Sequence, residues 1–343
     1  MGVNLRDLLI RREIALSDLS GKIIAIDAFN ILFQFLSSIR TSDGQLLMDS
    51  KGHVTSHLIG VFSRVSRLLV EGITPVFVFD GKPPVLKHEE RQKRREQKAE
   101  AQRKYEEAVE AGDAEAMKKF ASRTSYLSAE MIADAKQVLR LLGVAVVQAP
   151  GEGEAQAAVL ASQNRVWAVG SQDYDSLLYG TPRLVQNLSI AGKRKKMGKL
   201  GTVTVKPLCI DLEENLKKLG VSREQLIVVA MLVGTDYVPG GIKGLGPKKA
   251  LKLVQESSSI DEVFKAVNWD EHVDVKWTEV FELFVAPNVE SPVEIVTPPF
   301  CPKELREFLV CDRSFSEQRV DKTLNELSAV RKKKEQSSLD SFL

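Results

Sequence analysis

Carboxylate side chains dominate the parts of the sequence that can do chemistry. Three compact apolar runs, 22–27, 75–80 and 166–173, each end in aspartate, and two glutamates lie two residues apart in a Gly-rich stretch that begins at Pro150. Residues i and i+2 of an extended segment point to the same side, so each D/E-x-D/E pair would present two carboxylates together. The seven candidates are Asp27, Asp80, Glu152, Glu154, Asp173, Asp175 and Asp236.

So many converging carboxylates predict a divalent metal site. Like charges at close range raise one another's pKa values unless cations neutralise them. Ligands that are all oxygen, with no His or Cys nearby, favour Mg²⁺ or Mn²⁺ over zinc. Two such ions can activate water for attack on a phosphodiester without a histidine base. The alternative for any single aspartate is that it caps the helix or turn after its strand.

Alternating strands and helices must position these acids. The three apolar runs are typical of buried parallel strands, and helical patterns cover 57–70 and 128–142. This alternation predicts an α/β fold with a mainly parallel central sheet flanked by helices. In such sheets ligands bind beyond the carboxyl ends of the strands, which would place the aspartates on one rim.

The overall composition excludes several classes of protein. The chain has 48 Lys and Arg against 46 Asp and Glu, is 43% hydrophobic, and its longest unbroken apolar run is 226–233. A membrane helix needs about 20 residues, so no membrane contact is expected. The three cysteines lack C-x-x-C spacing, and no P-loop or signal-peptide pattern is present. We expect a cytoplasmic or nucleoid-associated protein, or a nuclear one if its source is eukaryotic.

Positive charge gathers in a few segments. Residues 87–104 contain eight Lys and Arg against four Glu, typical either of a solvated helix or of a basic insertion that binds an anion. Residues 193–199 contain five positive side chains, which suit a hairpin on a duplex backbone or a solvated turn. The Gly-rich stretch 240–250 permits a helix start that holds phosphate, or merely connects two helices. Nucleic acid would explain all three segments.

The motifs resemble the structure-specific 5′-nuclease superfamily, and their order and spacing are similar to its flap endonuclease family in the archaeal form. The resemblance covers the whole chain. It implies a PIN/5′-nuclease-like domain over 1–326, with a helical arch at 82–126, a helix-two-turn-helix region at 226–256 and a flexible tail at 327–343. The motifs that carry it are Asp27 and the stretches 79–84, 150–156, 171–175 and 234–237.

The resemblance also implies roles for particular residues. The seven acids would hold two Mg²⁺ ions, with Mn²⁺ as a substitute, and Lys87 and Arg94 would steer the scissile phosphate. Their i,i+7 spacing places both on one helical face. Phe33 occupies the position of an aromatic ring that stacks on a base, and the helix-two-turn-helix would bind duplex phosphates and K⁺. Further DNA contacts are expected from Gly2, Arg64, Arg67, Lys193, Arg194, Lys195, Lys196, Lys199, Gly244, Gly246, Lys248 and Lys249.

The last residues resemble a sliding-clamp binding peptide of the form Q-x-x-L-x-x-F-F. Gln336, Leu339 and Phe342 match, and Leu343 replaces the second aromatic.

The implied function is a monomeric 5′ flap endonuclease with 5′-3′ exonuclease activity. It would cut branched DNA near the junction of single strand and duplex, in lagging-strand maturation and repair. One alternative is a repair nuclease of the same superfamily that acts on bubbles. Another is a non-catalytic branched-DNA scaffold for the clamp, which the seven acids argue against because negative charge facing phosphates would only weaken binding.

Overall fold

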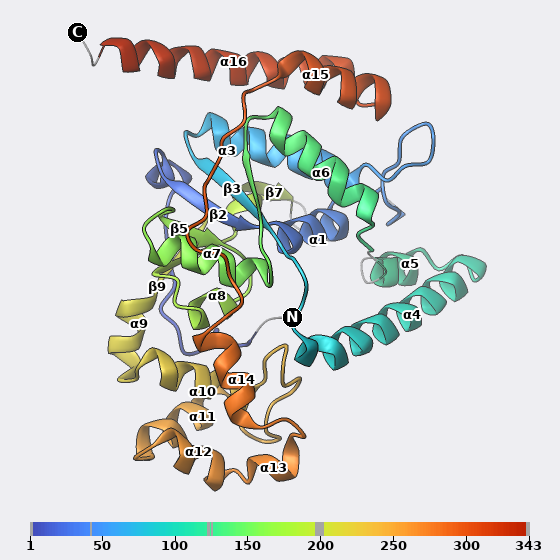
Figure 1. Cartoon of the computed structure of the whole chain (residues 1–343). Coiled ribbons are helices and arrows are strands. Elements are labelled where there is room, and N and C mark those ends of the chain that lie inside the picture. Colours follow the sequence, from blue (N-terminus) through green and yellow to red (C-terminus); the bar gives the residue numbers. More distant parts are fainter. Residues whose placement is uncertain (1–2, 42, 122–123, 125, 196–201, 341–343) are drawn as a thin grey trace.

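The computed structural model describes residues 3–41, 43–121, 124, 126–195 and 202–340. A seven-stranded sheet lies at the centre of this part of the chain (Figure 1). Five consecutive strands, from β6 to β4 at one edge, are parallel, and antiparallel pairing of β6 with β9 and of β9 with β1 extends the other edge, so the predicted α/β fold is confirmed with a mixed sheet. In the order β1-β9-β6-β5-β2-β3-β4 the strands are Arg12–Glu13, Leu208–Asp211, Arg183–Gln186, Ala168–Gly170, Ile23–Asp27, Thr74–Phe79 and Ala145–Gln148.

Successive side chains of the central strands enter two different cores. In β2, Ile24 and Ile26 pack into the core on one face of the sheet, whereas Ala25 packs into the core on the other. This alternation follows from the two-residue period of a strand. Because all three residues are fully buried, β2 reads as a continuous apolar run.

Helices cover both faces of the sheet. The face with Ile24 carries α1 (Ala28–Ser38), α2 (Ser56–Gly60), α3 (Ser66–Val70) and α6 (Ala129–Leu141). A single π-helical turn, η2 (Val61–Val65), joins α2 to α3, so the two predicted helices at 57–70 and 128–142 are both present. On the other face lie α7 (Gly153–Ser162), α8 (Asp175–Leu178), α9 (Leu212–Leu219) and α10 (Arg223–Val233).

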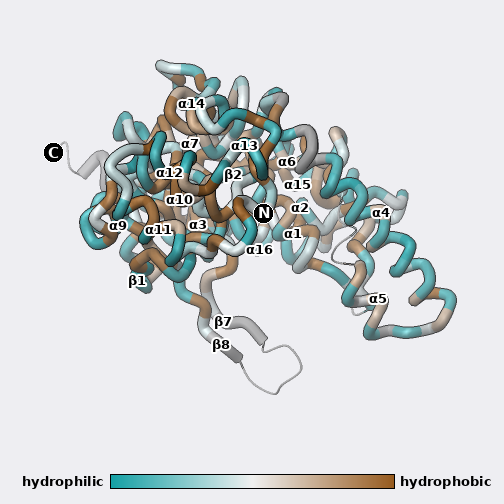
Figure 2. Tube along the Cα trace, turned by 90° about the horizontal axis from the view of Figure 1, so that it is seen from below, coloured by the Kyte–Doolittle hydropathy of each residue, from teal (hydrophilic) through white to brown (hydrophobic). Residues whose placement is uncertain are grey.

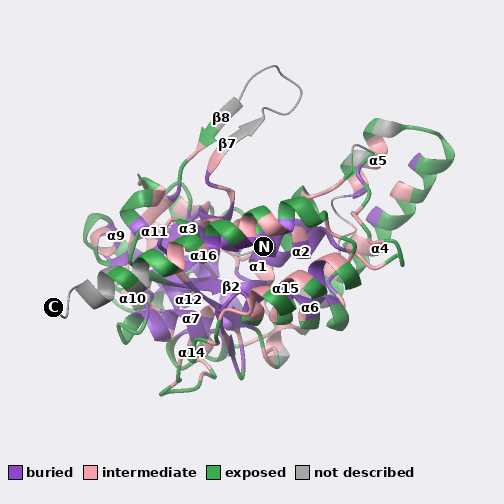
Figure 3. Ribbon diagram, turned by 90° about the horizontal axis from the view of Figure 1, so that it is seen from above, coloured by how far each residue is buried: buried purple, intermediate pink, exposed green. Residues whose placement is uncertain are grey.

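Two elements project from this layered body. The helices α4 (His88–Glu110) and α5 (Ala114–Ala121) form a pair to one side, preceded by a short 3₁₀ turn η3 (Val85–Lys87). Figure 2 shows that this pair is mostly hydrophilic, and Figure 3 shows how much of it is exposed. The second projection is a hairpin of β7 (Gly192–Lys195) and β8 (Thr202–Val205). Between its strands, Lys196 and Lys199 lie outside the described residues.

Further helices lie beyond α10. They are α11 (Pro247–Glu256), α12 (Ile260–Ala266), α13 (Trp269–His272) and α14 (Trp277–Val285), followed by an extended stretch at 287–300 that runs back along the body to α15 (Pro302–Glu307). After a π-helical turn, η5 (Phe308–Asp312), the chain ends in α16 (Glu317–Asp340). Among the described helices, none combines the length and the apolar composition that crossing a membrane requires.

The C-terminal segment differs from the flexible tail that the sequence predicts. Helix α16 continues through Asp340, and Leu327 within it is buried. The Arg331 guanidinium donates to the Leu142 carbonyl at 2.8 Å and lies 4.6 Å from the ring centroid of Phe300. These contacts hold the first part of the segment as helix against the body.

Candidate functional site

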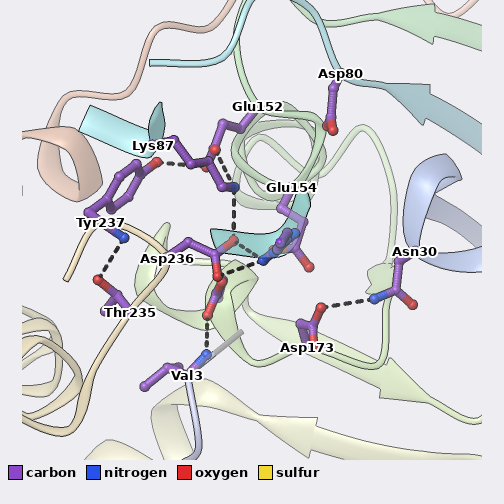
Figure 4. A network of polar contacts seen from close by, with 12 residues as sticks. Val3, Asn30, Asp80, Lys87, Glu152, Glu154, Asp173, Thr235, Asp236 and Tyr237 are labelled. Atoms are coloured by element: carbon purple, nitrogen blue, oxygen red, sulfur yellow. Dashed lines mark hydrogen bonds and ion pairs between the residues drawn. The ribbon is translucent and has the colours of Figure 1, made fainter. Parts of the chain in front are cut away.

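All seven predicted carboxylates line a single cavity of about 930 Å³. Two basic side chains, Lys87 and Arg94, and the ring of Phe33 line the same cavity. Acids that lie as much as 209 positions apart in the sequence, from Asp27 to Asp236, therefore meet at one place. Figure 4 shows how several of them face one another.

The strand ends position two of the aspartates. Asp27 closes β2 and also caps α1, because its carboxylate accepts from the Asn30 N–H at 3.1 Å. Asp80 follows β3 and accepts from the Gly153 N–H at the start of α7 at 2.7 Å. A Cβ at Gly153 would lie 2.7 Å from the same Asp80 oxygen, so only glycine permits this approach. Capping and a place in the cavity are thus compatible roles for Asp27.

The paired acids reach the cavity in a different way from the one predicted. Glu152 precedes α7 whereas Glu154 lies in its first turn, and Asp175 is the first residue of α8. Neither pair is an extended segment, so the i,i+2 strand argument is wrong, although all four side chains line the cavity. The Glu154 carboxylate accepts from the Ser171 hydroxyl at 2.7 Å.

The N-terminal segment and α1 contact the remaining acids. The Val3 N–H donates to Asp175 at 2.8 Å, so the start of the described chain lies beside the site, while Gly2 is outside the described residues. The Asn30 amide donates to Asp173 at 3.0 Å (Figure 4).

Burial and mutual repulsion perturb the acids strongly. Burial raises the pKa of Asp27 to about 8, with Asp80 adding to the effect, and raises the pKa of Asp175 to about 7, with Asp236 adding to it. Burial likewise raises the pKa of Asp80 and lifts that of Glu154 well above its ordinary range. The positive charge around these four groups is too small to offset their burial and mutual repulsion, so their protonated forms are favoured.

Two cations from the η3–α4 segment neutralise part of this charge. The Lys87 ammonium lies 2.6 Å from Glu152 and 3.0 Å from Asp236, and one Arg94 nitrogen donates to both Asp236 oxygens at 3.0 Å. Burial would lower the pKa of Lys87, but the two carboxylates raise it above its usual value. Burial would raise the pKa of Asp236, but Lys87 and Arg94 hold it below its usual value.

The donor set fits divalent cations even though the side chains are not gathered around one point. Among the described residues, no three His, Cys, Asp or Glu side chains are arranged as the ligands of a metal ion would be. Instead, the Lys87 ammonium lies between the carboxylates of Glu152 and Asp236. When ionised, the seven carboxylates still outnumber the four basic side chains that line the cavity, Lys87, Lys93, Arg94 and Lys98, and hard cations with oxygen ligands would balance that excess of negative charge.

An aromatic ring and a third cation lie next to the acids. The Lys98 ammonium is 4.9 Å from the ring centroid of Phe33, which is 36% exposed on α1. In this structure the ring expected to stack on a base is exposed, and a cation from α4 lies over it.

The other predicted DNA contacts that belong to the described residues lie outside the cavity. Arg67 donates to the Ala191 carbonyl at the base of the β7–β8 hairpin, and Arg64 is half-buried on η2. Gly244 has a φ of +89°, a conformation that favours glycine, and Gly246 precedes Pro247 at the start of α11. Exposed side chains follow at Lys248 and Lys249, whereas Lys193, Arg194 and Lys195 belong to β7.

The predicted clamp peptide lies at the end of α16. Gln336 is exposed and Leu339 lies in the final turn of the helix, whereas Phe342 and Leu343 are outside the described residues.

Sequence reasoning missed the residues that hold the acids in place. Tyr179 and Tyr237 each lie 2.7 Å from one oxygen of Glu152 through their hydroxyls. Burial, reinforced by the charge of Glu152, holds the pKa of both tyrosines above the ordinary value, so both hydroxyls stay protonated. Tyr237 lies in the motif stretch 234–237 but was given no role, and Asn30 is a polar residue amid the apolar stretch that follows Asp27, whereas Tyr179 carried no signal in the sequence.

Comparison with known proteins identifies what this arrangement resembles. The family models for the XPG N-terminal domain and the XPG I-region match residues 1–101 and 143–236. The chain is 49% identical to flap endonuclease 1 of Pyrococcus abyssi, over 100% of this chain and 98% of that protein. It is 46% identical to flap endonuclease 1 of Thermofilum pendens, over 100% of this chain and 99% of that one.

Solved structures give the same result. Flap endonuclease-1 from Methanococcus jannaschii has 40% identity and a TM-score of 0.76, over 97% of this chain and 100% of that one. The catalytic core of Rad2 in complex with DNA substrate has 25% identity and a TM-score of 0.70, over 95% of this chain and 100% of that one.

Proposed function

The chain belongs to the flap endonuclease family of structure-specific 5′ nucleases, and we propose that its cavity is where the phosphodiester of DNA is hydrolysed. It is a structure-specific endonuclease and exonuclease that depends on divalent metal, acts on DNA, and has a role in replication and repair. The observation that carries the proposal is the convergence of seven carboxylates on one cavity with Lys87 and Arg94. Hydrolysis would take place there, near the junction of a 5′ flap with duplex DNA.

The seven carboxylates would hold two Mg²⁺ ions, for which Mn²⁺ can substitute. When bound, these ions supply an activated water and stabilise the charge on the departing oxygen. The chain's contribution is to keep acids from separate segments at one rim. It does so through short bonds such as those from Gly153 to Asp80, from Ser171 to Glu154 and from Val3 to Asp175.

Lys87 and Arg94 would exchange carboxylate partners for phosphate. Both lie at the base of the α4–α5 arch and contact acids of the site. A guanidinium binds carboxylate and phosphate through the same forked geometry, so Arg94 can pass from Asp236 to a phosphate oxygen. Phe33 would stack on a base once Lys98 leaves its ring.

DNA beyond the cavity would contact separate basic surfaces. Gly244, Gly246, Lys248 and Lys249 would bind duplex phosphates at the N-terminus of α11, with K⁺ in the turn before it. The β7–β8 hairpin would lie on another part of the backbone, with Arg64 and Arg67 nearby, and Gly2 would contact DNA as a separate element. Support comes from the exposure of the α11 lysines and from the Arg67 bond to the base of the hairpin.

The remaining proposals concern organisation and partners. Residues 1–326 would act as one nuclease domain and as a monomer, in the cytoplasm or on the nucleoid. Residues 336–343 would bind a sliding clamp, with Leu343 in place of an aromatic anchor. The exposure of Gln336 on α16 supports this assignment.

The decisive experiment is cleavage of an end-labelled double-flap DNA at single-nucleotide resolution, with Mg²⁺ or EDTA. Single-stranded DNA, an intact duplex and a bubble serve as comparison substrates. We expect one Mg²⁺-dependent cut near the flap junction. Asp175→Ala should abolish the cut and leave flap binding within a few-fold, because a ligand is lost but the basic surfaces remain. Unchanged turnover of Asp175→Ala would refute the metal assignment, and equal cleavage of the bubble would favour the bubble-specific alternative.

A further inference from the structure

Two buried tyrosines converge on one oxygen of Glu152. The hydroxyls of Tyr179 and Tyr237 each lie 2.7 Å from Glu152 Oε2, and they lie 2.9 Å from each other. Both tyrosines are only 6% exposed. Burying a hydroxyl to this extent costs free energy unless it forms a hydrogen bond, so each tyrosine depends on Glu152 as its acceptor.

The count of protons decides how the three oxygens bond. Two hydroxyls offer two protons for three short contacts, and a bond to a carboxylate is stronger than a bond to a neutral hydroxyl. Both tyrosines therefore donate to Glu152 Oε2. The contact between the two hydroxyls follows from their sharing one acceptor.

The second oxygen of Glu152 has a different environment. Oε1 accepts from the Lys87 ammonium at 2.6 Å, on the side where Asp236 also contacts Lys87 (Figure 4). Rotation of the carboxylate would break both tyrosine bonds at once. One oxygen is thus tied to the protein interior, and the other is turned toward the cavity.

The two tyrosines also join segments that carry other acids. Tyr179 follows directly after α8, whose first residue is Asp175, and Tyr237 is adjacent to Asp236. Each bond to Glu152 therefore fixes the start of α7 against another acid-bearing segment. The rings pack on Phe284, with centroid distances of 5.2 and 5.3 Å, which limits their movement.

We infer that Tyr179 and Tyr237 are positioning residues that hold Glu152 with Oε1 toward the cavity, where it helps to bind divalent metal. This inference rests on the proposed metal site. Groups that hydrogen-bond metal ligands orient them, and their loss typically lowers metal affinity or activity by about 10- to 100-fold.

The test measures Mn²⁺ binding to the DNA-free, full-length protein, using the electron paramagnetic resonance signal of free Mn²⁺. Tyr179→Phe and Tyr237→Phe each remove one hydroxyl and keep the ring. We expect each to weaken Mn²⁺ binding by about tenfold. The matched control is Phe284→Leu, which loosens the same packing without removing a hydrogen bond and should leave Mn²⁺ affinity within about twofold of the parent.

A second comparison isolates Glu152. In a Glu152→Ala background, adding Tyr179→Phe should weaken Mn²⁺ binding no further, because the acceptor of the hydroxyl is already gone. In cleavage assays the tyrosine variants should need about tenfold more Mg²⁺ for half-maximal rate, with flap affinity unchanged. A structural defect alone would not produce this selective shift.

Three outcomes would count against the inference. Parent-like Mn²⁺ affinity in both tyrosine variants would overturn it while leaving the metal site intact. An equal loss in Phe284→Leu would assign the effect to packing. Absence of Mn²⁺ binding by the parent protein would overturn the metal assignment and this inference together. If Tyr237→Phe fails to fold, as judged by its thermal melt, Tyr179→Phe alone decides.

Discussion

His57 makes the stability of this fold depend on pH in a way that can be calculated. The residue lies on α2 between α1 and α6 and is completely buried, and neither of its ring nitrogens has a hydrogen-bond partner among the described residues. Burial lowers its pKa to about 4, and the positive charge of Arg313 contributes in the same direction. The folded protein therefore holds this imidazole neutral where an exposed histidine would be charged.

The sign and size of the effect follow from proton linkage. Between pH 4 and pH 6.5 the unfolded chain binds a proton at His57 and the folded protein does not, so stability rises with pH across this window. At pH 5, which is about 1.5 units below the pKa of an exposed histidine, His57 is mostly protonated in the unfolded chain. At roughly 1.4 kcal/mol per pH unit, the free energy of unfolding is therefore about 2 kcal/mol lower at pH 5 than at neutral pH.

The assay compares urea unfolding of the parent and of His57→Leu at pH 5 and pH 7.5. Leucine fills much of the same space without a titrating group, so its free energy of unfolding should lack this contribution. The titrating acids of the cavity are the same in both proteins and cancel in the comparison. We expect the parent to lose about 2 kcal/mol more than the variant on going to pH 5.

A second histidine provides the control. His272 is exposed in α13, and His272→Leu should retain the full pH dependence of the parent. Parallel pH dependence in the parent and His57→Leu would refute the reasoning, since it would mean that the folded protein protonates His57 as readily as the unfolded chain does.

Three further predictions concern the active site and the C-terminal peptide. With Asp27 and Asp175 raised to pKa values of about 8 and 7, their contribution to the stability of the metal-free fold should fall as pH rises from 4 to 8, opposite in sign to that of His57. Saturating Ca²⁺ should therefore raise the melting temperature more at pH 8 than at pH 6. Phe33→Ala should slow cleavage by about tenfold or more through lost stacking, whereas Lys98→Ala should stay within a few-fold; equal losses would argue against stacking. Deleting 336–343 should spare cleavage of naked DNA and abolish stimulation by a sliding clamp, and stimulation that survives would place the contact elsewhere.

The sequence predicts the strand-end acids well because local rules determine them. The residues from Ile24 to Ile26 are apolar throughout, which is the pattern of a strand buried on both faces, and Asp27 is the first residue at which that pattern stops. The helices were equally predictable where caps mark them. Ser128 caps α6 by accepting from the Met131 N–H, and Gly143 beyond its end has a φ of +74°.

The local rules fail where tertiary contacts decide the conformation. Glu154 was expected in an extended pair with Glu152, but the Gly153 N–H bonds to Asp80, and the Ala-rich sequence that follows forms α7 from that point. The tyrosines around Glu152 could not be predicted for a related reason. Tyr179 lies 27 positions from its acceptor and Tyr237 lies 85 positions away, so no local pattern links either residue to it.

The contacts of Lys87 connect the stability of the site with its function. Its ammonium bridges Glu152 and Asp236, and this pairing offsets part of the repulsion among the buried acids. Divalent cations and an incoming phosphate would each compete for one side of that bridge, the cations for the carboxylates and the phosphate for the ammonium. Binding of either one should therefore weaken the hold of the acids on Lys87. Because Lys87 directly precedes α4, the arch would be released from the site by the same ligands that the site is built to bind.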